Sequence, residues 1–491
     1  MKKYLISLIL FSSFSCENDT PDPIPNPDPI EYSLTLNISP DGGGTLSKSS
    51  GVFNENEIVS VLATANENYN FDSWTGSVIS NNNPLSITMD SDKIITANFT
   101  EIELCEIDYS TLHTGINTLT SHYQPMNIPF VDYANQINAV SNIENINTYQ
   151  LWHQHLNING NNIPDQILVE VDHNTEINGL AHVFIDNEFA YSFGNESHAI
   201  RQLEIGDLDG NGTDDAVFIS TGIDREPFTG DPIVAVYLST SGAEIDIVAE
   251  KRSYRHAGSL GDLDGDGDLD LIAIDNLQFQ NGNGMEEILW YENNGKGTWV
   301  EKKTNIPNIF LQNTYQIELF DLNNDGILDL IGGTSEWRAE WFDNVGLPVD
   351  IDERTKIILG QGNGQFNWEN PIVIEPINNW GVITDLDFYD LDNDGYNEII
   401  VTRTSGPGTY QEGTYYNGFK IQILKGVNNE YNTTHVLEMP INWGSMWIYN
   451  SIVYDVNNDC ILDIIPENDR TIVDAYFEGT SNFEYELKYK D

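Results

Sequence analysis

The sequence predicts an all-β protein that ends in a β-propeller, and three observations carry this prediction. Six similar acidic segments recur at intervals of 50, 55, 59, 69 and 65 residues, beginning at residues 157, 207, 262, 321, 390 and 455. An apolar run of four to six residues follows each segment, and further strand-like runs such as "DPIVAVYLS" follow that run. Four short strands in each repeat of this length are typical of propeller blades. We expect six four-stranded blades over residues 148–491, with seven blades as the alternative.

The N-terminus predicts export. "MKKYLISLILFSSFSC" begins with a basic stretch and continues with an apolar run that is too short to span a bilayer, so residues 1–16 are predicted to be a signal peptide. They resemble a bacterial lipoprotein signal, in which Cys16 becomes the lipidated first residue; ordinary cleavage nearby is the alternative. Residues 17–31, rich in Pro and Asp, then form an extended linker. The resemblance implies an outer-membrane or cell-surface lipoprotein of a bacterium, held to the membrane by lipid alone.

Residues 32–100 predict a separate small all-β domain ahead of the propeller. Apolar and polar residues alternate in "YSLTLNISP", "IVSVLATA" and "KIITANFT", with turn-forming clusters between them. "FDSWTGS" and "NPLSITMDSDKIITANF" resemble the divergent bacterial B-repeat family of cell-surface proteins. We expect Trp74 to be a core aromatic residue of this domain, with ligand stacking as the alternative. Residues 101–147 are expected to be a connector.

The net charge excludes one class of partner. Lys and Arg number 21 and Asp and Glu 77, which gives a formal net charge of −56. A chain this acidic has no basic patch to neutralise phosphates, so no nucleic-acid partner is expected. The acidity belongs either to solvating surface charge or to ligands of cations.

The acidic segments are not EF-hands. An EF-hand needs an acidic residue at position 12 of its loop and a helix after it. Here a strand-like run follows each segment, and position 12 of the last five is occupied by Phe218, Ala273, Gly332, Val401 and Pro466. A nine-residue loop fits instead, with acids or amides at positions 1, 3, 5 and 9. Glycine at position 6 allows the positive φ of a tight turn, and the carbonyl of position 7 adds an oxygen. Such an all-oxygen, charged cage favours Ca²⁺ over Mg²⁺ and transition metals.

These loops resemble the cation loops of FG-GAP and VCBS repeats, as in integrin-type propellers. "WYENNGKGTW", "EWFDNVG" and "LGQGNGQF" resemble the phrases that follow such loops in bacterial VCBS proteins. The resemblance covers about residues 148–491 and implies five calcium sites. Their expected ligands are Asp207, Asp209, Asn211 and Asp215; Asp262, Asp264, Asp266 and Asp270; Asp321, Asn323, Asp325 and Asp329; Asp390, Asp392, Asp394 and Glu398; and Asp455, Asn457, Asp459 and Asp463.

Two of the six loops depart from the pattern. The first has one charge among its four ligand positions and Asn162 in place of glycine, so weak or no binding is expected of Asn157, Asn159, Asn161 and Asp165. The sixth has Cys460 at the glycine position, which predicts a strained turn. We expect the ions to be structural, because four side chains and a carbonyl leave little room for substrate; ligand bridging or catalysis is the alternative.

A disulfide between Cys105 and Cys460 is predicted, because a closed ring brings the start and the end of the propeller together. Two separate thiols are the alternative. If Cys16 carries lipid, these two are the remaining cysteines of the chain, and export exposes them to oxidising conditions.

The sequence favours a binding protein over an enzyme. It contains no G-x-S-x-G, H-E-x-x-H or P-loop motif. His153 and His155 alternate as in a metal site but lack a third ligand, so we expect ordinary strand residues. Trp380 and Trp443 lie in a repeated "NWG", where sugar stacking competes with packing between blades.

Two functions therefore follow from the sequence. The first is a surface-anchored adhesion or binding lipoprotein for an extracellular glycan or protein. The alternative is a polysaccharide-active lyase or hydrolase, because some lyases that act on acidic pectins are calcium-bearing propellers. Paired carboxylates for such chemistry are an open alternative, since their pairing depends on the fold.

Overall fold

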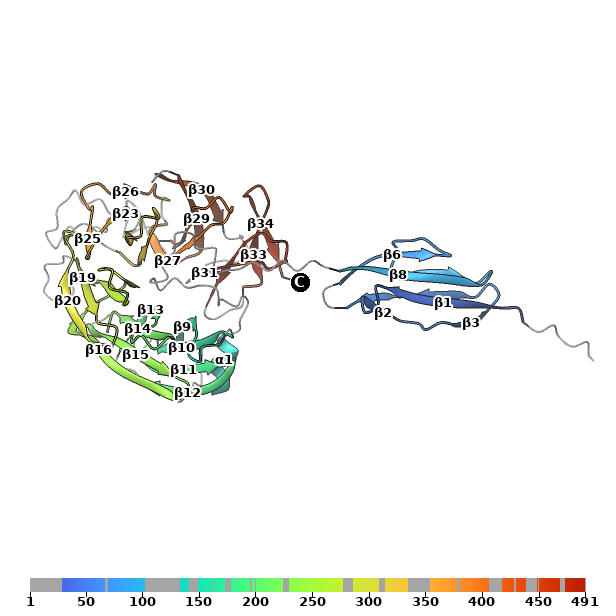
Figure 1. The fold of residues 1–491 in the computed structure, drawn as a ribbon, viewed down its shortest axis with the longest axis horizontal. Helices are drawn as coiled ribbons and strands as arrows, with labels where there is room; N and C mark the ends of the chain where they lie inside the picture. The colour runs from blue at the N-terminus through green and yellow to red at the C-terminus, as the bar shows by residue number, and fades with distance from the viewer. Residues whose placement is uncertain are drawn as a thin grey trace, which may run out of the picture. The chain divides into compact units, whose positions relative to one another are not determined.

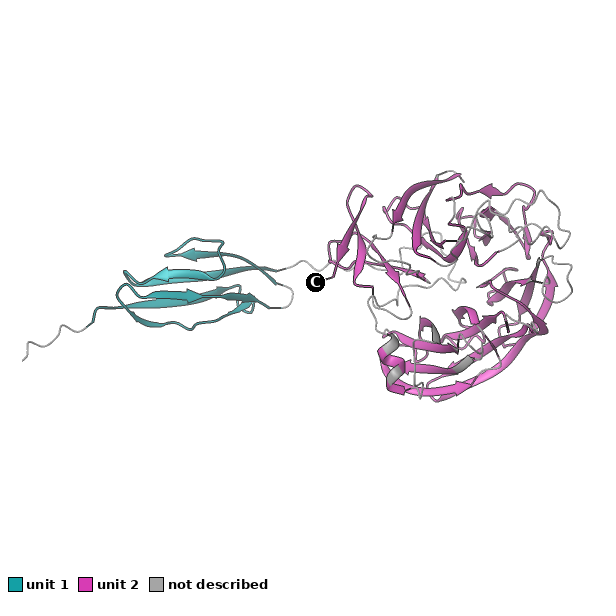
Figure 2. Cartoon of the chain, turned by 180° about the vertical axis from the view of Figure 1, so that it is seen from behind, with its two compact units in different colours: residues 1–104 teal, residues 105–491 magenta. Residues whose placement is uncertain are grey.

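The computed structural model describes residues 29–66, 69–101, 133–140, 149–161, 163–172, 178–194, 197–198, 200–223, 229–276, 286–308, 314–333, 354–377, 380–405, 417–427, 430–438, 448, 450–468 and 473–490. The chain divides into two compact units, residues 1–104 and residues 105–491 (Figure 2). In the part of the chain that the structure describes, no helix is long and apolar enough to span a membrane.

Unit 1 is a small β-structure with its own core. Its main sheet has the order β3-β1-β8-β6, with β1 parallel to β8, and two further pairs join β2 to β5 and β4 to β7. These strands are β1 (Glu31–Ser39), β2 (Gly44–Leu46), β3 (Gly51–Asn54), β4 (Ile58–Val61), β5 (Ala63–Ala65), β6 (Tyr69–Gly76), β7 (Leu85–Thr88) and β8 (Lys93–Glu101). Trp74 is fully buried, and its Nε1 donates to the carbonyl of Asn82 at 3.1 Å. Its role as a core residue is confirmed.

Among the described residues, unit 2 contains six four-stranded antiparallel sheets, each built from strands that are consecutive in the chain apart from one inserted hairpin. The first three sheets are β9 (Tyr149–Leu156), β10 (Asp165–Asp172), β11 (Asn178–Ile185) and β12 (Glu188–Gly194); β13 (Ile200–Gly206), β14 (Asp215–Ser220), β15 (Asp231–Ser239) and β16 (Gly242–Ser253); and β17 (Gly258–Gly261), β18 (Asp270–Asn276), β19 (Glu286–Asn293) and β20 (Trp299–Lys303).

The last three sheets are β21 (Ile317–Phe320), β22 (Asp329–Gly332), β23 (Lys356–Ile358) and β26 (Ile372–Val373); β27 (Val382–Tyr389), β28 (Glu398–Thr404), β29 (Phe419–Val427) and β30 (Glu430–Glu438); and β31 (Asn450–Tyr454), β32 (Asp463–Glu467), β33 (Ala475–Gly479) and β34 (Tyr485–Tyr489). The pair β24 (Gly360–Gly362) and β25 (Gln365–Phe366) forms the hairpin inserted in the fourth sheet. The sheets follow one another through unit 2 in chain order (Figure 1). The all-β class is confirmed; the described residues add one helix, α1 (Tyr133–Val140).

A hydrophobic core lies between each sheet and the next. Buried side chains of successive sheets form five shared clusters, from the first and second sheets to the fifth and sixth. Aromatic pairs mark two of these contacts: Phe193 stacks on Phe218 with ring centroids 6.4 Å apart, and Phe320 on Phe388 at 4.5 Å. The inner strands carry Val, Ile and Leu side chains on both faces. These side chains form the shared cores, because a sheet that is covered on both sides buries both of its faces.

The sixth sheet also contacts the first. His153 Nε2 on β9 lies 2.8 Å from Glu467 Oε2 on β32, and both side chains are buried. Within the described residues this contact between the two sheets is polar, whereas successive sheets share apolar cores. The first and last sheets of unit 2 therefore lie side by side.

Candidate metal centres

Each acidic loop connects the first strand of its sheet to the second. The third loop, for example, joins β17 to β18 between Gly261 and Asp270. All the loops thus lie at the same end of their sheets, where first strands finish and second strands start; we call it the loop end. Because each loop joins a first strand to a second strand, every set of predicted ligands lies at the loop end.

The aspartate at position 1 shapes the loop by accepting backbone hydrogen bonds. In the third loop, Asp262 Oδ1 accepts from the N–H of Gly265 at 2.7 Å, and Oδ2 accepts from the N–H of Gly267 at 3.1 Å. Asp207, Asp321, Asp390 and Asp455 accept from position 6 in the same way. These bonds wrap the backbone around one carboxylate, as Asx-turns do.

Position 6 requires a left-handed backbone. The φ angles there are +85°, +98°, +82° and +91° for Gly212, Gly267, Gly326 and Gly395. Cys460 adopts the same conformation in the sixth loop with φ +70°. The predicted strain is therefore present, because a Cβ atom disfavours this region.

The acid at position 9 anchors the loop to the sheet. Asp270 opens β18 and accepts from the N–H of Leu263 at 3.1 Å within the loop and from that of Asn293 at 2.8 Å on the third strand. Asp215, Asp329 and Asp463 make the same pair of bonds. The link to the third strand was not predicted from the sequence, because it depends on sheet register.

The position 9 acids are costly to ionise without a cation. Burial raises the pKa of Asp215, Asp270, Asp329 and Asp463 to about 7 and that of Glu398 to about 8, against the lowering effect of their backbone hydrogen bonds. Neighbouring carboxylates of the same loops raise these pKa values further. A bound divalent cation removes this cost, because opposite charge favours the ionised form.

Three of the loops bring three carboxylates together. One oxygen from each residue lies within 4.8 Å of the others in three groups: Asp207, Asp209 and Asp215; Asp262, Asp264 and Asp270; and Asp390, Asp392 and Glu398. The fourth and sixth loops have an amide at position 3, where the Oδ1 of Asn323 and of Asn457 accepts a backbone N–H of its own loop.

The donor set fits a hard cation. Every converging atom is oxygen, and most are carboxylate, which suits Ca²⁺. In the fifth loop, Asp392 Oδ1 and Glu398 Oε1 are buried and accept no hydrogen bond. Buried oxygens without donors are rare in folded proteins unless an ion or water satisfies them.

The first loop differs, as its sequence predicts. Asp165 supplies its single carboxylate and accepts from the N–H groups of Ile158 and Asp186. The side-chain amides of Asn159 and Asn161 donate to Asp186 Oδ1 at 3.1 and 2.7 Å. These amides are thus committed to a hydrogen-bonded turn of low charge, which favours little or no cation binding.

One contact in the fifth loop was missed by the sequence analysis. Lys425 on β29 extends into the acidic cluster, with Nζ 2.7 Å from Asp394 Oδ2 and in contact with Asp392. The lysine lies more than thirty residues along the chain from the start of the loop, so only the pairing of β28 with β29 reveals it.

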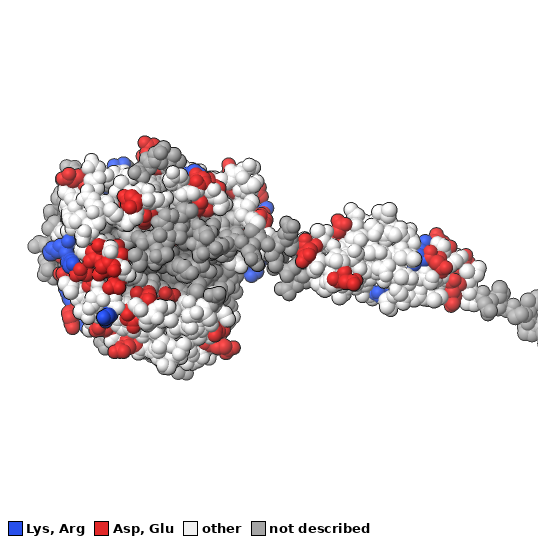
Figure 3. Space-filling model, viewed as in Figure 1, with Lys and Arg blue, Asp and Glu red and all other residues white. Residues whose placement is uncertain are grey.

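The opposite end of the sheets gathers the arginines. Within the described residues every arginine lies near the start of a first or third strand, or near the end of a second or fourth: Arg201, Arg252, Arg255, Arg354 and Arg403. We call this the arginine end. Visible acidic side chains are spread widely over both units, and basic ones are few (Figure 3).

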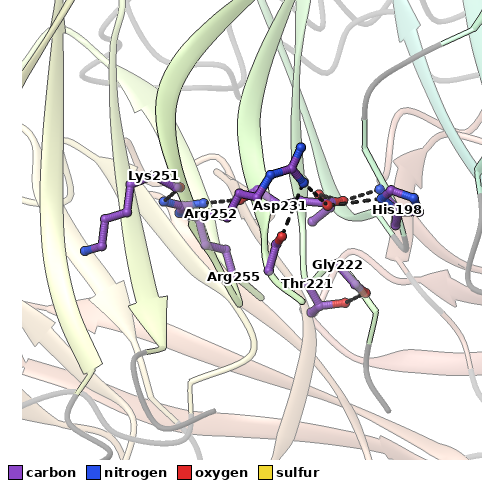
Figure 4. A network of polar contacts seen from close by, with 9 residues as sticks. His198, Thr221, Gly222, Asp231, Lys251, Arg252 and Arg255 are labelled. Carbon is purple, nitrogen blue, oxygen red and sulfur yellow. Dashed lines mark hydrogen bonds and ion pairs between the residues drawn. The ribbon is translucent and has the colours of Figure 1, made fainter. Parts of the chain in front are cut away.

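A polar network joins the second and third sheets at the arginine end. Asp231 lies between His198 on one side and Arg252 and Arg255 on the other (Figure 4). Arg255 is fully buried; its NH1 donates to the carbonyl of Asp231 at 2.7 Å and its Nε to Asp275. The charges in this network are therefore largely neutralised within the protein.

Arg403 has a different environment. It is fully buried, with its Nε donating to Gln422 Oε1 at 2.9 Å and NH2 to Thr355 Oγ1 at 3.2 Å, both neutral groups. Complete burial lowers its pKa to about 10. The side chain therefore stays cationic at neutral pH although its two hydrogen-bond acceptors are neutral.

The remaining predicted residues are two tryptophans, two histidines and the three cysteines. Trp380 is half-buried ahead of β27, with Lys420 Nζ 5.3 Å from the centre of its ring. His153 binds Glu467 and His155 Nε2 lies 3.2 Å from Gln166 Nε2, so both are strand residues with protein partners. Cys16, Cys105 and Trp443 lie outside the described residues, so what the sequence predicts for them stays a prediction. Cys460 is disulfide-bonded, and its pairing with Cys105 stays a prediction.

Comparison with protein families agrees with both resemblances in the sequence. Residues 34–103 match the divergent InlB B-repeat domain, and residues 262–332 match the FG-GAP-like repeat. The chain carries both repeats. The FG-GAP-like match spans the third acidic loop and extends through the fourth to β22, so two of the predicted sites lie within it. A comparison with curated proteins finds no significant match.

Proposed function

We propose that the protein is a surface-displayed lipoprotein whose unit 2 is a closed, six-bladed, calcium-stabilised FG-GAP propeller that binds an extracellular glycan. The FG-GAP-like match, the six consecutive four-stranded sheets and the contact between His153 and Glu467 support the closed propeller. The B-repeat domain and the lipidated Cys16 then serve as spacer and anchor. The observation that carries the calcium sites is the convergence of three carboxylate oxygens in each of the second, third and fifth acidic loops.

The ions have a structural role in this proposal. In the second, third, fourth and sixth loops the position 9 acid bonds both its own loop and a residue near the end of the third strand, so a bound ion braces two turns of one blade. Four side chains and a carbonyl fill most of the coordination sphere of Ca²⁺ and leave little room for a ligand to bridge. The glycan is therefore expected away from the loop end.

We place the glycan at the arginine end. Trp380 is half-exposed there with a lysine beside its ring, an arrangement that suits stacking on a sugar and pairing with its acidic substituents. Arg252 and Lys251 expose 57% and 38% of their side chains at the same end, where they pair with Asp231 and Asp275. These features favour a polyuronate or another acidic glycan.

An array of neutral and acidic glycans tests this proposal. We expect the purified chain to bind acidic members, and expect Trp380→Ala to weaken that binding about ten-fold or more, since one stacked ring contributes about 1–3 kcal/mol. Trp299→Ala, which alters a half-buried ring hydrogen-bonded to Tyr237, is the control and should keep binding. Binding to proteins alone would replace the glycan with a protein partner, and release of oligosaccharides from pectin or alginate would replace the binding module with an enzyme.

A further inference from the structure

A lysine on a neighbouring strand contacts the carboxylates of the fifth acidic loop. Lys425 follows Leu424, which pairs with Ile399, so the register of β28 and β29 places Lys425 beside Glu398, the position 9 acid. Its Nζ lies 2.7 Å from Asp394 Oδ2 and 3.9 Å from Glu398 Oε1, and it contacts Asp392. The ammonium thus contacts three of the four carboxylates that are expected to bind calcium.

The other acidic loops have no cation at this register. The strand pairings place different residues opposite the position 9 acid of the second, third, fourth and sixth loops, and these are Tyr237, Glu292, Leu359 and Glu478. Two of these residues are acidic and none is basic. The fifth loop therefore has a lower net negative charge than the third, although each contributes four carboxylates.

The position of Lys425 is supported by the neighbouring sheet. The ring of Phe483, between β33 and β34, lies 5.5 Å from Lys425 Nζ, and only 23% of the lysine side chain is exposed. Burial alone would lower the pKa of Lys425, but hydrogen bonds to Asp392 and Asp394 raise it above its usual value. The group is a charged ammonium held from two sides.

The lysine leaves part of the site unsatisfied. Asp392 Oδ1 and Glu398 Oε1 are buried and accept no hydrogen bond while Lys425 is in place. Moreover, one oxygen each from Asp390, Asp392 and Glu398 still lies within 4.8 Å of the others. The loop therefore retains the oxygen geometry of a cation site beside its lysine.

We propose that Lys425 caps the fifth site and competes with calcium, so that this loop fills only at concentrations that already saturate the second and third loops. The inference rests on the proposed calcium sites. At low calcium the ammonium neutralises the cluster; at high calcium the ion takes Asp392 and the lysine moves toward solvent. Unit 2 then has tightly held ions and one exchangeable ion of lower affinity.

Calcium titration of Lys425→Met by calorimetry and equilibrium dialysis tests the cap. Methionine keeps most of the aliphatic length and removes the charge, so one weak site should become at least about ten-fold tighter. Without calcium, the variant should unfold at a lower temperature than wild type, because four clustered carboxylates lose their cation. With saturating calcium the difference should disappear.

Lys302→Met is the matched control. Lys302 pairs with Glu292, the residue that occupies the register of Lys425 in the third sheet, and it lies 4.6 Å from the ring centre of Trp290. Its partner Glu292 is hydrogen-bonded to Asp264 of the third loop, so any effect of this substitution falls on the third site, and the affinity of the fifth site should stay unchanged. The reciprocal variant Leu359→Lys should weaken one site, in the fourth loop.

The outcomes separate the two proposals. If wild type binds no calcium, the proposed sites fail and the cap fails with them. If wild type binds calcium but Lys425→Met and Leu359→Lys both leave every affinity unchanged, the cap alone is wrong. A tighter fifth site in Lys425→Met supports the cap, and so does a weaker fourth site in Leu359→Lys; either result is enough if the other variant does not fold.

Discussion

His153 and Glu467 lie 314 residues apart in the sequence and 2.8 Å apart in the structure. Asn450 donates to the same oxygen of Glu467 at 2.8 Å, so one carboxylate joins the first strand of the first sheet to two strands of the sixth. The contact is buried, where a charge-assisted hydrogen bond is strong and an unpaired carboxylate is costly. The proposed closed ring requires such a contact between the first and sixth sheets.

A double-mutant cycle measures this junction. His153→Leu and Glu467→Gln should each destabilise unit 2, and the double variant should lose less than the sum, with a coupling energy of about 1–2 kcal/mol. Urea unfolding of the four proteins gives the energies. Additivity of the two single effects within about 0.5 kcal/mol would show that the first and sixth sheets are not joined here.

Arg255 should matter far more than Arg252, although both belong to one network. Arg255→Met leaves the buried Asp275 with Lys251 as its remaining cation, so we expect a loss of about 3 kcal/mol or more. Arg252→Met removes an exposed cation and should cost about 1 kcal/mol or less. Equal losses in thermal or urea unfolding would contradict the assigned burial of Arg255.

The buried His155 should make the first sheet less stable in acid. Burial lowers its pKa to about 4 from 6.5, with the nearby His153 as a smaller cause in the same direction and Glu467 opposing both. As pH falls, His155 is therefore protonated in the unfolded chain before it is protonated in the folded chain. The part of the unfolding free energy that is fully present above pH 6.5 is lost between pH 6.5 and 4. At pH 5 this single residue accounts for about 2 kcal/mol.

The matching variant is His155→Gln, which keeps a side chain able to accept from Gln166. Its unfolding free energy should change less between pH 7 and pH 5 than that of wild type, by about the same 2 kcal/mol. The comparison is made by urea unfolding at each pH. An identical pH dependence in the two proteins would mean that His155 titrates normally.

Cys460 has two opposing effects on the stability of the protein, and a single variant separates them. Its φ of +70° costs a non-glycine residue about 1 kcal/mol, so Cys460→Gly should stabilise the reduced protein. The same change removes the disulfide and should destabilise the oxidised protein by about 2–4 kcal/mol. Peptide mapping without reductant identifies the partner, which we predict to be Cys105; a shift of the same sign under both conditions would contradict this account.

Much of the candidate site could be predicted from the sequence, because its information is local. Ligands two residues apart, a glycine at position 6 and an apolar strand after the acid at position 9 all lie within one loop. The buried Trp74 was likewise predicted from the small size of its domain. Physical rules for turns and ligands act over these short distances.

The rest depends on contacts between distant segments. The second hydrogen bond of Asp270 goes to Asn293 on the third strand, and Lys425 reaches its loop only through the register of β28 and β29. The pair His153 and Glu467 requires the arrangement of all six sheets. A register shift of one residue would move each of these side chains to the other face, and the sequence pattern alone does not set that register.

Thermal unfolding of the purified full chain in 10 mM CaCl₂ and in EDTA tests the central claim, the calcium loops, most directly. At dissociation constants typical of extracellular sites, each bound ion adds about 2 kcal/mol to the free energy of unfolding at this concentration. Four occupied loops should therefore raise the unfolding temperature by roughly 10 °C. Asp270→Asn should lose about a quarter of this increase. Asp268→Asn, at position 7 of the same loop, should keep it, because that position contributes only its carbonyl. Equal unfolding temperatures in calcium and EDTA, with no difference between the two variants, would contradict the account.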